Sequence, residues 1–560
     1  IVWDRACQAR TPRDNPVMVP GLVRMFPMPS YGSDAFRDEV RQYLGALAEA
    51  LSSLLYPQGP IVMVQLDHGA LMTQRCGPYE QDYHPDSIRR YRAHLRQQYG
   101  RIEALSEAYG TLEGADEGHR FTGIEPPRRF DARTPEDLLR HLDWVGFQEA
   151  LVGDAYRAFS GALRDGGFEG CLLSAQLPAA ADRTAVTAAA LGGAVDLVGV
   201  TVGGAASESS RVDLARLCGA LAVRSLSGDT PPYAAEMASG FAPLSSPRDA
   251  QDTIFSAMTA LAYGVRGFNL HMAVERDRFI GAPIGAHGDL EAGADTWQKL
   301  NAALDRVKFR TLRRELPVRI VMPAMARRLM RVMDALGSAA PVLPFGQGAR
   351  ARCLENDFGL GHRVAIDADT FALSFEQALD ARGVPYARVA GEECPQALDA
   401  AAWIICPTAG PMGKEVRQQL SEAHEAGARL TLGPIPNILD ERFRSLAAGK
   451  VFGPRAEILD KVDPASADAA VARAIEQLDL PSYACDPDTV HATVHVDEAN
   501  EIQVVFVINS GPSDVAARAT IGVDAQWEDA MDQTHTRSES GVLEAHLRAR
   551  SVRMLIRREA

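Results

Sequence analysis

Two stretches of this chain place ionisable side chains directly after apolar, strand-like runs. Asp67 and His68 follow the run at residues 61–66, and Glu236 ends the run at residues 233–236. A carboxylate can serve as nucleophile, acid or base, and a histidine can act as a general acid near pH 7. In parallel sheets, reactive groups lie at the carboxyl ends of the strands, where the loops form the pocket. The spacing therefore predicts nucleophilic or acid–base chemistry at one edge of a parallel sheet.

The elements that must position these groups alternate between strand and helix up to residue 272. Such alternation implies parallel pairing through right-handed crossovers, which suits a (β/α)8 TIM-type barrel. A barrel has eight strands, whereas about five strand units are visible, so we expect the first three upstream of Ile1 or in another chain. An open doubly wound sheet is the competing interpretation. The predicted strands lie at residues 61–66, 171–175, 195–202, 221–226 with 233–236, and 265–271.

Two further domains are expected downstream of the barrel. Short strands separated by helices at residues 371–381 and 414–426 predict a flavodoxin-like α/β domain. After about residue 480 the apolar pattern has a period of two, which predicts a small antiparallel β-sandwich. We therefore expect an incomplete barrel at residues 1–315, the α/β domain at 316–480 and the sandwich at 481–560. The strands are expected at residues 318–322, 386–389, 403–406 and 429–432, and then at 493–496, 502–508, 517–521 and 552–556.

Composition narrows the class of partner. The 58 basic and 73 acidic residues give a net charge of -15, which argues against nucleic acid or an anionic membrane and favours a neutral, polar substrate. No apolar run reaches the roughly 18 residues of a membrane span. The eight cysteines lack a CxxC pair, which is typical of free thiols and predicts a cytoplasmic protein. Without a GxGxxG or P-loop motif, we expect no cofactor.

The motifs and their order resemble glycoside hydrolase family 42 β-galactosidases and their family 35 relatives. The resemblance is carried by residues 59–67, by Gln98-Tyr99-Gly100 and Ala108-Tyr109-Gly110, by the segment around Glu236, and by residues 268–283. It implies a catalytic barrel, an α/β domain often used in oligomer contacts and a C-terminal sandwich. It also implies a carbohydrate substrate, a β-galactoside or related sugar, and a homo-oligomer formed through the α/β domain.

A retaining glycosidase needs two carboxyl groups about 5–5.5 Å apart, one as nucleophile and one as acid/base. The resemblance implies that Glu236 is the nucleophile, whereas His68 and Gly69 replace the usual Asn-Glu pair that contains the acid. Asp67 lies one layer deeper than residue 69 and is one methylene shorter than Glu. His68 is then either a substitute acid or, as the strand alternation favours, a structural histidine that points away from the pocket.

The same resemblance suggests residues that bind the sugar, with an ion-paired turn at residues 275–278 as the alternative. The expected contacts are Gln65, Phe268, Asn269, His271, Glu275 and Arg278. Some family 42 members carry a cysteine zinc cluster, but only Cys76 is present in the corresponding region. Asp82 and His84 could hold a metal weakly, although an ordinary exposed loop is favoured. We therefore predict no metal.

Two functions remain open at this point. The first is a glycosidase with an altered or absent acid/base, and the second is a catalytically inactive carbohydrate-binding or scaffolding homologue. General acid–base catalysis contributes about 10²- to 10⁴-fold, so substrates with good leaving groups can distinguish the two.

Overall fold

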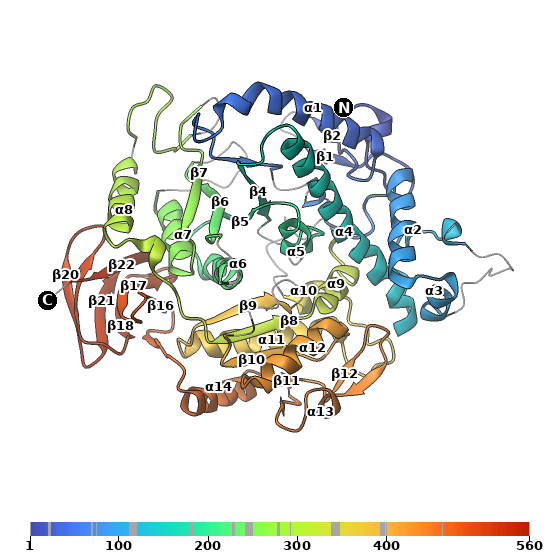
Figure 1. The fold of residues 1–560 in the computed structure, drawn as a ribbon. Helices are drawn as coiled ribbons and strands as arrows, with labels where there is room; N and C mark the ends of the chain where they lie inside the picture. Colours follow the sequence, from blue (N-terminus) through green and yellow to red (C-terminus); the bar gives the residue numbers. More distant parts are fainter. Residues whose placement is uncertain are drawn as a thin grey trace.

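Five parallel strands form the sheet that carries the candidate site: β3 (Met63–Gln65), β4 (Leu172–Leu177), β5 (Leu197–Val202), β6 (Tyr233–Ala238) and β7 (Gly267–His271). They pair in chain order, so the sheet is an arc of a β/α barrel (Figure 1). Sequential order is typical of barrels, whereas a doubly wound sheet reverses its order at a switch point. The structure describes residues 2–20, 24–68, 71–73, 75–110, 120–178, 183–226, 230–240, 250–276, 280–291, 293–337, 348–391, 398, 400–461 and 463–558.

All five strand units lie where the sequence predicted them, with one correction. Residues 221–226 are not a strand, because residues 221–225 form the end of helix α6 (Glu208–Ser225). Leu214, Cys218 and Leu221 are buried at the three-to-four spacing of a helix face. Ser207 caps this helix by accepting a hydrogen bond from the amide of Ser210.

Helices cover the arc, and the longest of them joins two cores. This helix, α4 (Pro135–Asp165), begins with a capping box formed by Thr134 and Asp137, and it packs against α1 (Asp34–Leu51) and α9 (Ala324–Val332). No helix in the described ranges is long and apolar enough to cross a membrane. The other helices of this half are α2 (Pro85–Tyr99), α3 (Ile102–Ala108), α5 (Ala188–Gly192), α7 (Ala250–Ala262) and α8 (Ala294–Arg306), and a ribbon of β1 (Met18–Pro20) and β2 (Met25–Pro27) lies near the N-terminus.

The second sheet is parallel and has the flavodoxin strand order, and it lies in the region where the sequence predicted a flavodoxin-like α/β domain. Its strands are β8 (Val318–Met322), β9 (Tyr386–Ala390), β10 (Trp403–Pro407), β11 (Arg429–Gly433) and β14 (Glu457–Ile458), in the order β14-β11-β10-β8-β9. Counted along this sheet alone, the order is 2-1-3-4-5. Around it lie α10 (Ala349–Arg352), α11 (Val364–Ala381), α12 (Lys414–Glu425), α13 (Ala448–Val451), α14 (Pro464–Leu478) and a ribbon of β12 (Asn437–Leu439) and β13 (Ser445–Ala447).

The C-terminal part is one curled antiparallel sheet, which corrects the predicted sandwich of separate sheets. Its strands are β15 (Cys485–Asp486), β16 (Val490–Val496), β17 (Ile502–Asn509), β18 (Val515–Thr520), β19 (Gln526–Asp529), β20 (His535–Glu539), β21 (Val542–Leu547) and β22 (Ser551–Arg557). The order β15-β18-β21-β20-β19-β22-β17-β16 is continuous because the β19–β20 hairpin joins the two halves. The domain limits at residues 315 and 480 stay predictions.

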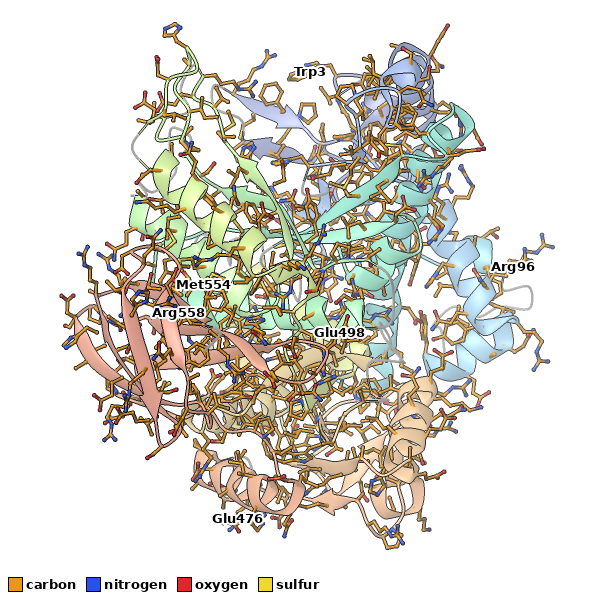
Figure 2. The ribbon with its side chains drawn as sticks, turned by 60° about the vertical axis from the view of Figure 1, so that its left-hand side comes forward. Trp3, Arg96, Glu476, Glu498, Met554 and Arg558 are labelled. Carbon is orange, nitrogen blue, oxygen red and sulfur yellow. The ribbon has the colours of Figure 1, made fainter. Side chains whose placement is uncertain are left out.

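Both faces of the C-terminal sheet are buried where it meets the half-barrel. Val505 and Leu555 fill the interior of the sheet, whereas Phe506 and Met554 belong to the half-barrel core. Met554 lies at this boundary in Figure 2. His495 adds a polar link, because its Nε2 lies 3.1 Å from the carbonyl oxygen of Ala262 and its Nδ1 lies 2.9 Å from Arg266 Nη2.

The buried imidazole of His495 predicts that acid destabilises the contact between the C-terminal sheet and the half-barrel, and a second buried histidine, His141, adds to the effect on the whole chain. Burial, with the nearby arginines, holds the pKa of His495 well below its ordinary value, and burial lowers that of His141 to about 4. The unfolded chain binds these protons near pH 6.5 and the folded chain does not, so stability is lost as the pH falls below about 6.5. We expect the free energy of unfolding, measured with urea, to fall by about 1.4 kcal/mol per pH unit for each such histidine between pH 6 and pH 5.

His495→Gln should remove one histidine's share of that slope, since glutamine does not titrate. His287 is exposed and serves as the matched control, so His287→Gln should leave the slope unchanged. An equal slope in the wild type and the His495 variant would contradict this account.

Candidate active site

Glu236 lies on β6 with its carboxylate in the cluster at the carboxyl end of the parallel arc. Residue 236 pairs with Thr201 of β5, while its neighbours Ala235 and Met237 are buried and project to the other face. The Glu236 side chain is 20% exposed. Its Oε2 accepts a hydrogen bond of 2.7 Å from Gln176 Nε2, so the carboxylate has a fixed orientation and still reaches solvent.

A row of amides positions that carboxylate. Gln65 Nε2, on β3, donates to Gln176 Oε1 at 2.9 Å, and Gln176 on β4 donates to Thr201 Oγ1 as well as to Glu236. Gln65 Nε2 also lies 2.8 Å from the carbonyl oxygen of Asp67. The structure therefore uses Gln65, predicted as a sugar contact, to hold Gln176. The sequence analysis missed Gln176, although a glutamine inside a buried apolar strand was a usable signal.

Two histidines face the two oxygens of Glu236. His68 Nε2 lies 3.8 Å from Oε2, and His271 Nε2 lies 4.0 Å from Oε1. Their ring centres are 5.9 Å apart. The expectation that His68 points away from the pocket is wrong, because β3 ends at Gln65 and strand alternation does not extend to residue 68. The His68 side chain is 71% exposed, which also excludes a buried structural role.

Asp67 fixes the turn that carries His68. Its Oδ2 accepts a 2.6 Å hydrogen bond from Tyr31 OH, and its Oδ1 accepts a 2.7 Å hydrogen bond from the amide of His68. The hydroxyl of Tyr156 is buried close by, and its ring centre lies 6.4 Å from that of Tyr31. Burial and the charge of Asp67 raise the pKa of Tyr156 well above its usual range. Asp67 thus positions His68 through the backbone.

The other predicted sugar contacts have different surroundings. Phe268 is partly buried and packs on Trp297 with ring centres 5.8 Å apart, and its role as a sugar contact stays a prediction. Asn269 is exposed, and its Nδ2 lies 3.4 Å from the carbonyl oxygen of Ala235. Glu275 accepts a 2.8 Å hydrogen bond from the amide of Gly281 within its own loop. Arg278 and Gly69 lie outside the described residues.

The segment at residues 81–84 is buried, which corrects the expectation of an exposed loop. Asp82 accepts hydrogen bonds from the hydroxyls of Ser30 and Ser87, and His84 Nδ1 caps helix α2 by accepting from the amide of Asp86. Asp82 and His84 therefore stabilise the local structure through these hydrogen bonds. Over the ranges that the structure describes, no group of three or more His, Cys, Asp and Glu side chains has a metal-binding arrangement.

Comparison with known proteins agrees with this geometry. Residues 28–269 match the model of glycoside hydrolase family 42, described as beta-galactosidase. Beta-galactosidase BgaA of Thermus sp is 32% identical over 130 residues, which cover 23% of this chain. The match spans only 18% of the length of that relative.

Solved structures share the fold over nearly the whole chain. A beta-galactosidase from the psychrophilic Marinomonas ef1 has a TM-score of 0.69 at 13% identity, covering 99% of this chain and 87% of that one. An exo-carrageenase of family 42 from Bacteroides ovatus has a TM-score of 0.63 at 13% identity, covering 97% and 72%. The names of these two proteins specify different carbohydrates, so the shared fold does not identify the sugar.

The arc of parallel strands, with polar side chains clustered at its carboxyl edge, places the chain in the class of β/α-barrel proteins. Within that class, residues 28–269 are similar to the family 42 β-galactosidases, in agreement with the resemblance of the motifs.

The contrast between the two tyrosines beside Asp67 gives a test of the site's geometry. Tyr31→Phe removes a hydrogen bond to a carboxylate and should lower the free energy of unfolding by about 1.5–3 kcal/mol. Tyr156→Phe is the matched control and should cost less, because the Tyr156 hydroxyl lies beside the neutral hydroxyl of Tyr31 and is not bonded to a carboxylate. Urea unfolding measures both, and equal losses would contradict the assignment of the hydrogen bond to Tyr31.

Proposed function

We propose that this chain is a glycoside hydrolase of the family 42 type that cleaves β-galactosides or related sugars by a retaining mechanism. Glu236 is the nucleophile. The observation that carries the proposal is its carboxylate, held by Gln176 at 2.7 Å on a strand of the arc and still open to solvent. A nucleophile needs this combination, because the attacking oxygen must be oriented and reachable.

His68 is the proposed acid/base. An imidazole near neutral pH can protonate the leaving oxygen and, once neutral, take a proton from the water that hydrolyses the glycosyl-enzyme. The 3.8 Å between His68 Nε2 and Glu236 Oε2 is shorter than the roughly 5 Å that a glycosidic bond requires. Because the His68 side chain is largely exposed, it can rotate away to make that room.

His271 is proposed to bind a sugar hydroxyl on the other side of Glu236, with Asn269, Glu275 and Arg278 as further candidates from the same strand and its loop. We also retain as proposals a homo-oligomer formed through the flavodoxin-like part and a cytoplasmic location. The rival function is an inactive carbohydrate-binding or scaffolding homologue. The Asn-Glu pair of the resembled enzymes is absent from residues 68 and 69, and this observation favours the rival.

An activated aryl β-galactoside tests the nucleophile, because its leaving group needs little protonation. Glu236→Ala should lower turnover at least about 10³-fold. Added azide should then restore release of the aryl group and give a glycosyl azide of inverted configuration, since azide attacks in place of Glu236. Gln98→Ala, remote from Glu236, is the control for general damage. A wild-type protein that binds galactosides without any turnover would establish the inactive function instead.

His68→Ala tests the acid/base separately. Turnover of an unactivated galactoside should fall about 10²- to 10⁴-fold, while the activated substrate should lose much less. Azide should accelerate this variant and yield a glycosyl azide of retained configuration, because Glu236 still forms the intermediate. His271→Ala is the matched imidazole control and should affect the two substrates alike. Equal losses for both substrates in His68→Ala would remove His68 from the acid/base role.

The double variant His68→Asn with Gly69→Glu tests the comparison with the usual pair. If the strand is aligned correctly, it should gain activity on the unactivated galactoside over the wild type. The absence of any gain, with folding and sugar binding intact, would mean that residue 69 does not occupy the position of the usual acid.

A further inference from the structure

A small cavity lies where the half-barrel, the flavodoxin-like sheet and the C-terminal sheet meet. Its volume is about 40 Å³. It is lined by Tyr263 at the end of α7, by Asp380 of α11, by Tyr386 of β9, by Thr493 of β16 and by Arg314 from the segment before β8. A single water needs roughly 10–15 Å³ of such space, so the cavity can hold a water or a monatomic ion.

Two of the lining groups are buried polar groups that lack a partner. Arg314 Nε and Nη1 have no hydrogen-bond partner, and neither has the hydroxyl of Thr493. A guanidinium can only donate, and a hydroxyl can also donate. Buried donors without acceptors are costly, so the cavity calls for an occupant that accepts several hydrogen bonds at once.

Within the described part of the chain, no carboxylate is bonded directly to the Arg314 guanidinium, although Asp380 lies nearby. Its guanidinium lies over the Tyr263 ring, 5.0 Å from the ring centre. The neighbouring Arg266 is also buried and bonds to neutral acceptors, the carbonyls of Val265 and Leu312 and the imidazole of His495. Burial lowers the pKa of both guanidinium groups. The charge of Arg314 lowers the pKa of Arg266 further, whereas the nearby tyrosines and Asp380 raise that of Arg314.

The acidic side chains of this region bind other cations. Asp380 Oδ2 accepts a hydrogen bond of 2.8 Å from Arg211, and Glu208 pairs with Arg211 and, at 3.4 Å, with His491. A bound cation is excluded by the donors of Arg314. A small anion can accept hydrogen bonds from all three unpaired donors at once, whereas a water molecule accepts only two.

We propose that the cavity binds one small inorganic anion, of the size and chemistry of chloride, held by Arg314 Nε, Arg314 Nη1 and the Thr493 hydroxyl. The anion joins the three sheets, because its ligands come from the segment before β8 and from β16, and the cavity wall from α7 and α11. Folding of the junction is then linked to the concentration of the anion, since a ligand that binds only the folded chain stabilises it.

Urea unfolding of the full chain in sodium chloride and in sodium gluconate, at equal ionic strength, tests the proposal. The urea concentration at the midpoint of unfolding should rise with the concentration of chloride. It should not rise with the concentration of gluconate, which is too large for the cavity. Arg314→Met should weaken the chloride dependence about tenfold or more, as expected for the loss of a charged hydrogen bond. Arg313→Met is the matched control, because Arg313 is exposed and pairs with Glu315. It should keep the full chloride dependence.

Bromide gives a direct readout that does not depend on a variant that folds. A crystal of the wild-type protein soaked in sodium bromide should give one anomalous peak within hydrogen-bonding distance of Arg314 Nε and Thr493 Oγ1. Thr493→Val should weaken that peak. A wild type that unfolds identically in chloride and gluconate and gives no peak in the cavity would mean that it holds water only, and would overturn the proposal.

Discussion

The hydrogen bond from Gln176 to Glu236 is the interaction on which the candidate site depends. It runs from β4 across β5 to β6, and its donor is held in turn by Gln65 on β3. The register of the parallel strands thus determines how the carboxylate of Glu236 is oriented. A fixed dipole that points at the carboxylate costs no reorganisation when the group reacts, which is how rigid scaffolds assist chemistry.

The remainder of the site follows from where the strands stop. Because β3 ends at Gln65, the chain is free to turn, and the carboxylate of Asp67 then binds both Tyr31 and the amide of His68. That turn brings the His68 imidazole beside Glu236. On the opposite side, β7 ends at His271, so two imidazoles flank one carboxylate. The proposed mechanism takes both its nucleophile and its proton donor from this arrangement, with a single carboxylate where the resembled enzymes use two.

The sequence predicted most of the fold because most strands are apolar, β-branched runs between turn residues. It failed at residues 221–226, where the same apolar residues recur at helical spacing within α6. The curled C-terminal sheet was missed because alternation predicts strands but not whether a hairpin such as β19–β20 joins two sheets into one. Glu236 was found because it closes the strand-like run at residues 233–236, although β6 itself continues to Ala238. Gln176 was missed and His68 misplaced because side-chain bonds and strand ends depend on neighbours remote in sequence, as does the burial of Asp82 by Ser30 and Ser87.

The central claim is that Glu236 attacks the sugar, and covalent trapping tests it most directly. An activated 2-deoxy-2-fluoro-β-galactoside slows the second step of a retaining glycosidase more than the first, so the glycosyl-enzyme accumulates. Mass spectrometry of the protein and its peptides should find one added fluorosugar, on the peptide that contains Glu236. A galactoside-binding protein that acquires no adduct, or acquires it on another residue, would contradict the account.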